Sequence, residues 1–85
     1  WGLAPRVMAD AALLDEAIAL GRQLAAGPTR AFGGVKKMLL TSFTTDLEAQ
    51  MEYEARMISD MMRTEDGKEG IAAFLAKRKP EFRGI

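Results

Sequence analysis

The stretch 46–63 carries two neighbouring apolar stripes at helical spacing, and this feature constrains the fold more than any other. The first stripe consists of Leu47, Met51, Ala55, Ile58 and Met62, and the second of Tyr53, Met57 and Met61. Such spacing predicts a helix rather than a strand. The combined apolar arc is wider than a surface helix needs. We therefore expect this helix to be buried on two sides, within this chain or against another.

Local stop and start signals divide the chain into about four helices, so the predicted fold class is all-α. The expected helices span 10–26, 28–43, 46–63 and 65–79, with a non-helical lead-in over 1–9 and a tail over 80–85. Gly27 suits the end of one helix and Pro28 the first turn of the next. Pro80 ends the last helix. We expect residues 1–85 to form a single helical domain.

Caps and internal glycines refine these helices. Asp10 and Thr64 precede helical stripes and can accept a hydrogen bond from a first-turn amide. Thr45 has capping-box spacing with the glutamate three residues later. Gly33 and Gly34 each lower helix propensity by about 1 kcal/mol relative to Ala. They therefore predict a place where a neighbouring element approaches the backbone closely.

Composition excludes several classes of site. The 85 residues include no cysteine and no histidine, which rules out a disulfide framework, a Ser-His-Asp triad and an ordinary zinc site. The 12 basic and 12 acidic residues give a net charge of +0, so no long-range field attracts nucleic acid. The start at Trp1 lacks the pattern of a signal peptide. We expect a cytoplasmic chain that has been cut from a longer one.

A basic cluster near the C-terminus is the first candidate binding site. It consists of Lys77, Arg78, Lys79 and Arg83, next to Phe74 and Phe82. Cations bind phosphate oxygens, and an aromatic ring can stack on a purine base. The same charges also suit a solvated helix end, where they complement the helix dipole. Spacing alone leaves both interpretations open.

The acidic residues and methionines point mainly to structural roles. Glu52 and Arg56 have favourable i,i+4 spacing, and the acids at 65, 66 and 69 lie in a helix first turn. Glu54 borders the apolar stripe and is the one acid that could be buried with a basic partner. The methionines at 51, 57, 61 and 62 predict a core or a subunit interface, with a surface for variable apolar partners as the alternative. No nucleophile has an adjacent base, so the residues by themselves specify no reaction.

The run 69–82 reads E-G-I-A-A-F-L-A-K-R-K-P-E-F. It closely resembles the ending of crotonase-superfamily proteins, which has the form E-G-x-x-A-F-x-x-K-R-x-P-x-F. Three upstream segments are similar to the family in the same order: Trp1-Gly2-Leu3 followed by Val7, Ala26-Gly27-Pro28 followed by Lys36, and Leu47–Ala55 with Gln50 and Glu54 in place. Pro5 and Val35 depart from the family pattern. The Trp1-Gly2-Leu3 opening is similar to phenylacetate-pathway enoyl-CoA isomerases, which selects no substrate by itself.

The resemblance implies that the chain is the C-terminal helical part of an enoyl-CoA hydratase/isomerase with a crotonase-like α/β fold. Such an enzyme acts on acyl-CoA thioesters in fatty-acid or related degradation. It has no tightly bound cofactor, since coenzyme A is part of the substrate, and it assembles as a trimer or a dimer of trimers. The segment would serve oligomerisation and cover the coenzyme A site.

The resemblance also bears on individual residues. In the family the N-terminal part carries the oxyanion hole and the catalytic acids. We therefore expect no catalytic residue and no catalysis in these 85 residues alone. Phe74 and Lys77 match the Phe and Lys that lie near the adenine and phosphates of coenzyme A in the family.

A function of another class stays open beside this one. The chain could be a stand-alone helical interaction module, in which the helix over 46–63 forms a partner groove or a self-association face. A small nucleic-acid binder is a further option, against which the zero net charge speaks. We also expect the isolated chain to self-associate. In the parent, part of the apolar arc of the second and third helices would face the missing part or another subunit, and once exposed that surface exceeds what monomers usually tolerate.

Overall fold

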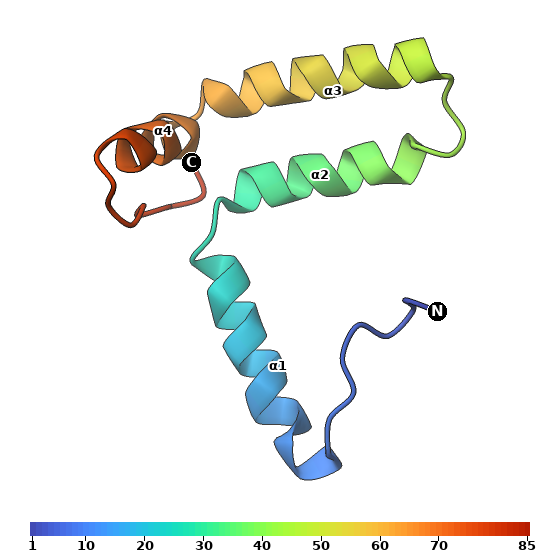
Figure 1. Cartoon of the computed structure of the whole chain (residues 1–85), viewed down its shortest axis with the longest axis vertical. Coiled ribbons are helices and arrows are strands. Elements are labelled where there is room, and N and C mark those ends of the chain that lie inside the picture. Colours follow the sequence, from blue (N-terminus) through green and yellow to red (C-terminus); the bar gives the residue numbers. More distant parts are fainter.

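The computed structural model describes residues 1–85 and contains four helices and no strand. The helices are α1 (Asp10–Ala25), α2 (Thr29–Thr41), α3 (Leu47–Met62) and α4 (Glu65–Leu75). Figure 1 shows α2 and α3 side by side as an antiparallel pair, α4 turned nearly end-on at the end of α3, and α1 pointing away from the pair. None of the helices combines the length and apolarity that a membrane crossing requires. The prediction of an all-α chain with a non-helical lead-in is confirmed.

The start of α4 follows the sequence prediction, whereas the start of α1 does not use the predicted cap. The Thr64 hydroxyl accepts a hydrogen bond from the Gly67 amide at 2.9 Å, as expected for an N-cap. Asp10 lies inside α1 as its first residue, and Ala9 occupies the cap position without a side-chain bond. An anionic side chain in the first turn still favours this end of the helix through the dipole.

The cap of α3 is Asp46 rather than Thr45. The Asp46 carboxylate accepts a hydrogen bond from the Ala49 amide at 2.9 Å, and the helix begins at Leu47. Asp and Thr both serve as N-caps, but the carboxylate also carries the negative charge that a helix N-terminus favours. The predicted capping box is therefore wrong in register by one residue.

α4 is shorter than predicted, because it ends at Leu75 and not at Lys79. The chain leaves the helix at Lys77, whose φ of 53° lies in the left-handed region. A residue in that conformation cannot continue a right-handed helix. The other three helices end close to their predicted boundaries.

The α2–α3 pair is held by one glycine and one glutamine. Gly34 is buried, and a Cβ added there would lie 2.9 Å from the Sδ atom of Met57 on α3. The buried Gln50 of α3 donates through Nε2 to the Met38 carbonyl of α2 at 3.2 Å. It also accepts a hydrogen bond from the Thr41 hydroxyl at 3.3 Å. The prediction of close approach is confirmed at Gly34, where the backbone of α2 makes room for a methionine.

Gly33 and Glu54 differ from their predictions. An added Cβ at Gly33 would meet nothing within 4 Å, so no neighbour explains this glycine. Glu54 is exposed, and its Oε1 accepts a hydrogen bond from Gln50 Nε2 at 2.9 Å rather than pairing with a basic residue. The burial expected for Glu54 is therefore wrong, because the chain provides no element above that side of α3.

The two apolar stripes of α3 have different surroundings. Tyr53, Met57 and Met61 are half-buried. The other stripe is exposed at Leu47, Met51, Ile58 and Met62. Only one of the two sides that the sequence requires to be buried is thus covered within this chain.

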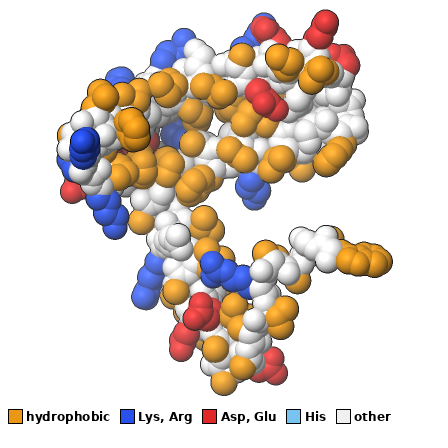
Figure 2. Space-filling model, viewed as in Figure 1, with side chains coloured by type: hydrophobic (Ala, Val, Ile, Leu, Met, Phe, Trp, Pro, Cys, Tyr) orange, Lys and Arg blue, Asp and Glu red, His pale blue; other side chains and the backbone are white.

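Little of the chain is buried as a whole. The four buried residues are Gly34, Gln50, Asp66 and Ala73. The accessible surface is 7359 Å², whereas a compact monomer of 9.3 kDa would expose about 5,000 Å². The radius of gyration is 16.2 Å, against about 12 Å for a compact chain of this length. Figure 2 shows hydrophobic side chains spread over all the helices on this face, including the edges of the open hollow between α1 and the α2–α3 pair.

The corner between α3 and α4 depends on Thr64 and Gly67. The Thr64 hydroxyl donates to the Met61 carbonyl at 2.6 Å while accepting from the Gly67 amide. One hydroxyl thus satisfies a backbone group at the end of α3 and another at the start of α4. A Cβ at Gly67 would collide with the Met61 carbonyl oxygen and would lie 3.0 Å from the Met62 Cα atom. These are backbone atoms, so the corner requires glycine.

Substitution of Gly67 by Ala should lower the free energy of unfolding by about 1–3 kcal/mol, the usual range for overpacking. The added methyl group meets backbone atoms that cannot move unless the corner opens. Gly33→Ala is the matched control, because Gly33 is also helical and has open space around it. It should stabilise α2 by up to about 1 kcal/mol. Thermal unfolding followed by far-ultraviolet circular dichroism measures both variants, and equal shifts in Tm would contradict the close approach at Gly67.

Candidate functional site

The C-terminal tail is fastened to α4 by two carboxylates of its first turns. Asp66 is buried, with 5% of its surface exposed, and its two oxygens accept hydrogen bonds from the amides of Arg83 at 2.8 Å and Gly84 at 2.7 Å. The Asp66 amide in turn donates to the Ile85 carbonyl at 2.9 Å. The tail therefore returns to the start of the helix that precedes it.

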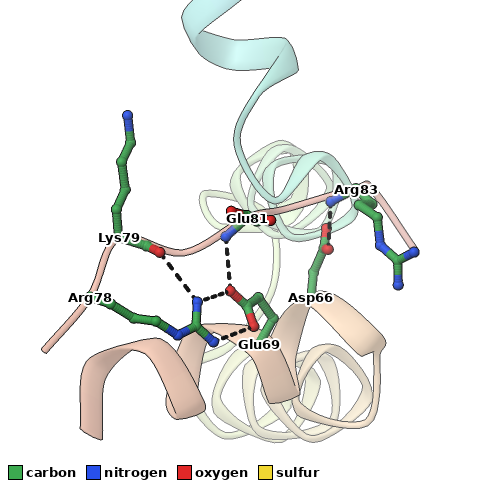
Figure 3. A network of polar contacts seen from close by, with 6 residues as sticks. All are labelled: Asp66, Glu69, Arg78, Lys79, Glu81 and Arg83. Carbon is green, nitrogen blue, oxygen red and sulfur yellow. Dashed lines mark hydrogen bonds and ion pairs between the residues drawn. The ribbon is translucent and has the colours of Figure 1, made fainter. Parts of the chain in front are cut away.

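Glu69 makes the second attachment, one turn further along α4. Its carboxylate accepts two hydrogen bonds from the Arg78 guanidinium, at 2.6 Å to Oε1 and 2.8 Å to Oε2. It also accepts one from the Glu81 amide at 2.9 Å. Figure 3 shows the guanidinium facing this carboxylate, while the Lys79 side chain points away from the network. The hydrogen bonds from Arg78 and then from Glu81 lower the pKa of Glu69 from 4.5 to about 2.

A left-handed turn at Lys77 lies between α4 and the fastened tail. The Lys77 amide donates to the Phe74 carbonyl at 3.1 Å, and the Arg78 amide donates to the Ala73 carbonyl at 3.0 Å. This is the Schellman pattern of a helix C-terminus, in which the left-handed position is usually glycine. Lysine in that conformation costs about 1–2 kcal/mol relative to a right-handed one. Lys77 is the one residue other than glycine with a positive φ.

Phe74 lies in the last turn of α4 with 82% of its surface exposed. An aromatic ring this exposed is available for stacking. The Lys77 amide donates a hydrogen bond to the backbone carbonyl of Phe74. The structure thus brings the two residues predicted from the sequence, Phe74 and Lys77, to the same helix end. In general, an aromatic ring can stack on a flat base and an ammonium can bind a phosphate.

The basic cluster predicted from the sequence divides into two parts. Arg78 is engaged by Glu69, and Phe82 packs against α4 at Gly70, where an added Cβ would lie 3.6 Å from its ring. These two residues hold the tail. Within this cluster, Lys77, Lys79 and Arg83 form no ion pair. The alternative interpretation, a helix end whose charges are solvated, therefore does not apply to Arg78.

Sequence reasoning missed the roles of Asp66 and Glu69. It assigned both acids to the helix dipole, which their place in the first turns supports. The pairing of Glu69 with Arg78 spans nine residues and needs the chain to reverse at Lys77. The absence of glycine at the turn concealed that reversal. The available signal was the presence of both charges, Glu69 and Arg78, in the terminal motif.

Two hollows border α4. The larger, about 750 Å³, is open and polar, and its wall includes Asp66, Glu69 and Arg78, the side chains that fasten the tail. The smaller, about 310 Å³, is apolar and lies where α2, α3, α4 and Phe82 meet. No group of acidic residues is arranged to hold a metal ion.

Comparison with known proteins decides the family. The sequence profile of the enoyl-CoA hydratase/isomerase family matches residues 1–84. The chain belongs to this family. It is 38% identical over 84 residues to the 1,2-epoxyphenylacetyl-CoA isomerase of Escherichia coli and 34% identical over 83 residues to the 2,3-dehydroadipyl-CoA hydratase of the same organism. The match covers 99% and 98% of this chain.

Solved structures of the family agree with this assignment. The crystal structure of an enoyl-CoA hydratase from Polaromonas sp. superposes with a TM-score of 0.88 at 32% identity and covers 96% of this chain. A Mycobacterium abscessus structure described by the same family name superposes with a TM-score of 0.95 at 35% identity and covers the full chain. The chain spans about a third of the length of these enoyl-CoA hydratase/isomerase relatives, 32% and 33% of the two structures.

The carboxyl group of Glu69 should titrate near pH 2. Because this pKa lies below the ordinary value of 4.5, the pair with Arg78 stabilises the folded tail fully above about pH 4.5. Its contribution is lost as the pH falls from 4.5 to about 2. A carbon NMR titration of the side-chain carboxyl group measures the value. Arg78→Gln should move it back toward 4.5, and an unchanged titration in that variant would exclude the guanidinium as the cause.

Proposed function

We propose that this chain acts as the C-terminal segment of an enoyl-CoA hydratase/isomerase that converts acyl-CoA thioesters in fatty-acid or related degradation in the cytoplasm. Within that enzyme the segment mediates oligomerisation and covers the coenzyme A site. The family match over residues 1–84 and its span of about a third of the relatives' length support this proposal. The observation that carries it is the exposed Phe74 beside the left-handed Lys77.

The exposed apolar surface supports the role in oligomerisation. The outer stripe of α3 and most apolar residues of α1 lie in contact with solvent. The chain exposes about 2,400 Å² more than a compact monomer of its mass. That excess is comparable to the area buried in a stable subunit interface. A trimer or a dimer of trimers with the rest of each polypeptide in place would cover it.

Phe74 and Lys77 support the role at the coenzyme A site. The ring can stack on the adenine and the ammonium can bind a phosphate, both far from the acyl group that reacts. Binding energy from a remote part of a substrate is used to orient the reacting part. The reaction itself would take place elsewhere in the enzyme, where backbone amides stabilise the enolate of the thioester. On this proposal the chain by itself binds coenzyme A but converts no enoyl-CoA.

Coenzyme A should bind the 85-residue chain, and Lys77→Ala should weaken this binding by about two- to five-fold, the range of an exposed charge pair. Phe74→Ala should weaken it about five-fold or more, because stacking on a base is lost. Chemical-shift titration at low ionic strength measures both affinities. A short enoyl-CoA added under the same conditions should remain unhydrated.

Lys79→Ala is the matched control for this experiment. It removes the same charge two residues further on, from a side chain that points away from the network (Figure 3). Its affinity for coenzyme A should stay close to that of the unaltered chain. Equal losses at Lys77 and Lys79 would indicate a non-specific attraction to positive charge, and no loss at Phe74 would contradict the site.

The isolated chain should self-associate through the outer stripe of α3. Sedimentation equilibrium at high concentration should give a mass above 9.3 kDa. Ile58→Lys should return the mass toward 9.3 kDa, since Ile58 lies on this exposed stripe. Glu52→Lys places the same charge on the polar side of α3 and should leave the association unchanged. A monomer at every concentration would argue against the oligomerisation role.

The second candidate function is a stand-alone helical interaction module. The exposed stripe Leu47, Met51, Ile58 and Met62 favours it, because methionine-rich helix faces accept varied apolar partners. Such a module would bind an amphipathic helix through α3 and would not depend on Phe74 or Lys77. Affinity for coenzyme A that is lost in Phe74→Ala therefore separates the two functions.

A further inference from the structure

The left-handed turn at Lys77 is held from both of its ends. On the helix side, the amides of Lys77 and Arg78 donate to carbonyls of the last turn of α4. On the tail side, Glu69 binds the Arg78 guanidinium and the Glu81 amide, at 2.6 Å and 2.9 Å from its Oε1 atom. The turn thus has its position fixed relative to one carboxylate on α4, as Figure 3 shows for the residues that follow it.

The Schellman hydrogen bonds on the helix side and the Glu69 hydrogen bonds on the tail side have different effects on the turn. Schellman hydrogen bonds occur at many helix ends, and glycine is the usual residue there because it adopts positive φ without strain. With lysine at this position, the turn is under strain and can relax to another conformation once the tail is free. The bidentate pair and the Glu81 amide prevent that relaxation by holding the residues directly after the turn. Glu69 is the carboxylate that holds the chain on the far side of Lys77.

A strained residue kept where glycine would fit better indicates that its side chain is used. At this turn the Lys77 amide is bonded to the Phe74 carbonyl, so the Lys77 backbone is held next to the residue that carries the exposed ring. Arg78, the next residue, is neutralised by Glu69. The one cation held in a defined conformation beside Phe74 and left without an ion pair is Lys77.

We propose that Glu69 is a positioning residue for coenzyme A: through Arg78 and the Glu81 amide it holds Lys77 in the left-handed conformation that directs the ammonium to a phosphate while Phe74 receives the adenine. Glu69 itself does not contact the ligand. This inference rests on the proposed coenzyme A site, and it adds the residue that keeps this site assembled before the ligand arrives.

The first test needs no ligand. The three-bond coupling constant and the carbon chemical shifts of Lys77 report whether its φ is positive. The 85-residue chain should show the left-handed signature, and Glu69→Ala should lose it, while Glu69→Gln, which keeps an oxygen for the Glu81 amide, should lose it in part. Glu65→Ala is the matched control, because it removes an acid of the same helix whose partner is Lys68. A left-handed Lys77 that persists in Glu69→Ala would overturn the inference.

The second test is a double-mutant cycle on the affinity for coenzyme A. Lys77→Ala and Glu69→Ala should each weaken binding by about two- to five-fold. The double variant should be no weaker than Lys77→Ala alone, because Glu69 acts only through Lys77. Additive losses would overturn the positioning role. A purely structural role of Glu69 would lower the Tm of the variant without this coupling.

The outcomes separate the two proposals. If Lys77→Ala leaves the affinity for coenzyme A unchanged, the proposed site fails, whatever the turn does. If Lys77→Ala weakens binding and Glu69→Ala does not, the site stands and the positioning role of Glu69 is wrong. Loss of the left-handed signature in Glu69→Ala together with non-additive affinities would support both.

Discussion

The third helix has to bury apolar side chains in two directions, and this chain covers only one of them. The half-buried stripe of Tyr53, Met57 and Met61 includes the place where Gly34 lets α2 approach Met57. The opposite stripe remains in solvent. The extended shape follows from this imbalance, because a chain without a second layer for α3 has no core around which α1 could close. On the proposed function, oligomerisation would cover this open surface.

Local signals predicted which parts of the chain are helical, because amphipathic spacing, Gly27-Pro28 and Thr64 act within a few residues. They predicted helix ends less well. Thr45 and Asp46 are both acceptable caps, and only the three-dimensional path of the chain selects Asp46. Burial was the least predictable property. Glu54 borders an apolar stripe in the sequence, yet whether it is buried depends on whether another element lies above it.

The residues of the candidate site could be proposed from the sequence, but their geometry could not. The terminal motif identified Phe74 and Lys77, and the structure places both at the end of α4. A helix continued to Lys79 would put Lys77 on the helix itself, whereas the left-handed turn directs the chain back toward Glu69 and Asp66. Nothing local requires that reversal, since lysine disfavours positive φ. It depends on hydrogen bonds between residues far apart in the sequence.

The two ends of α4 have different roles. Its first turns carry the carboxylates that fasten the tail, and its last turn carries the exposed ring beside the strained lysine. Asp66 and Glu69 accept hydrogen bonds from backbone amides of the tail. The end of the chain is thereby held against α4, a short helix that buries only Asp66 and Ala73. On the proposed function, a ligand at this helix end would meet the exposed Phe74 ring and the ammonium of Lys77. A backbone that is held in one conformation before the ligand arrives lowers the entropy lost on binding.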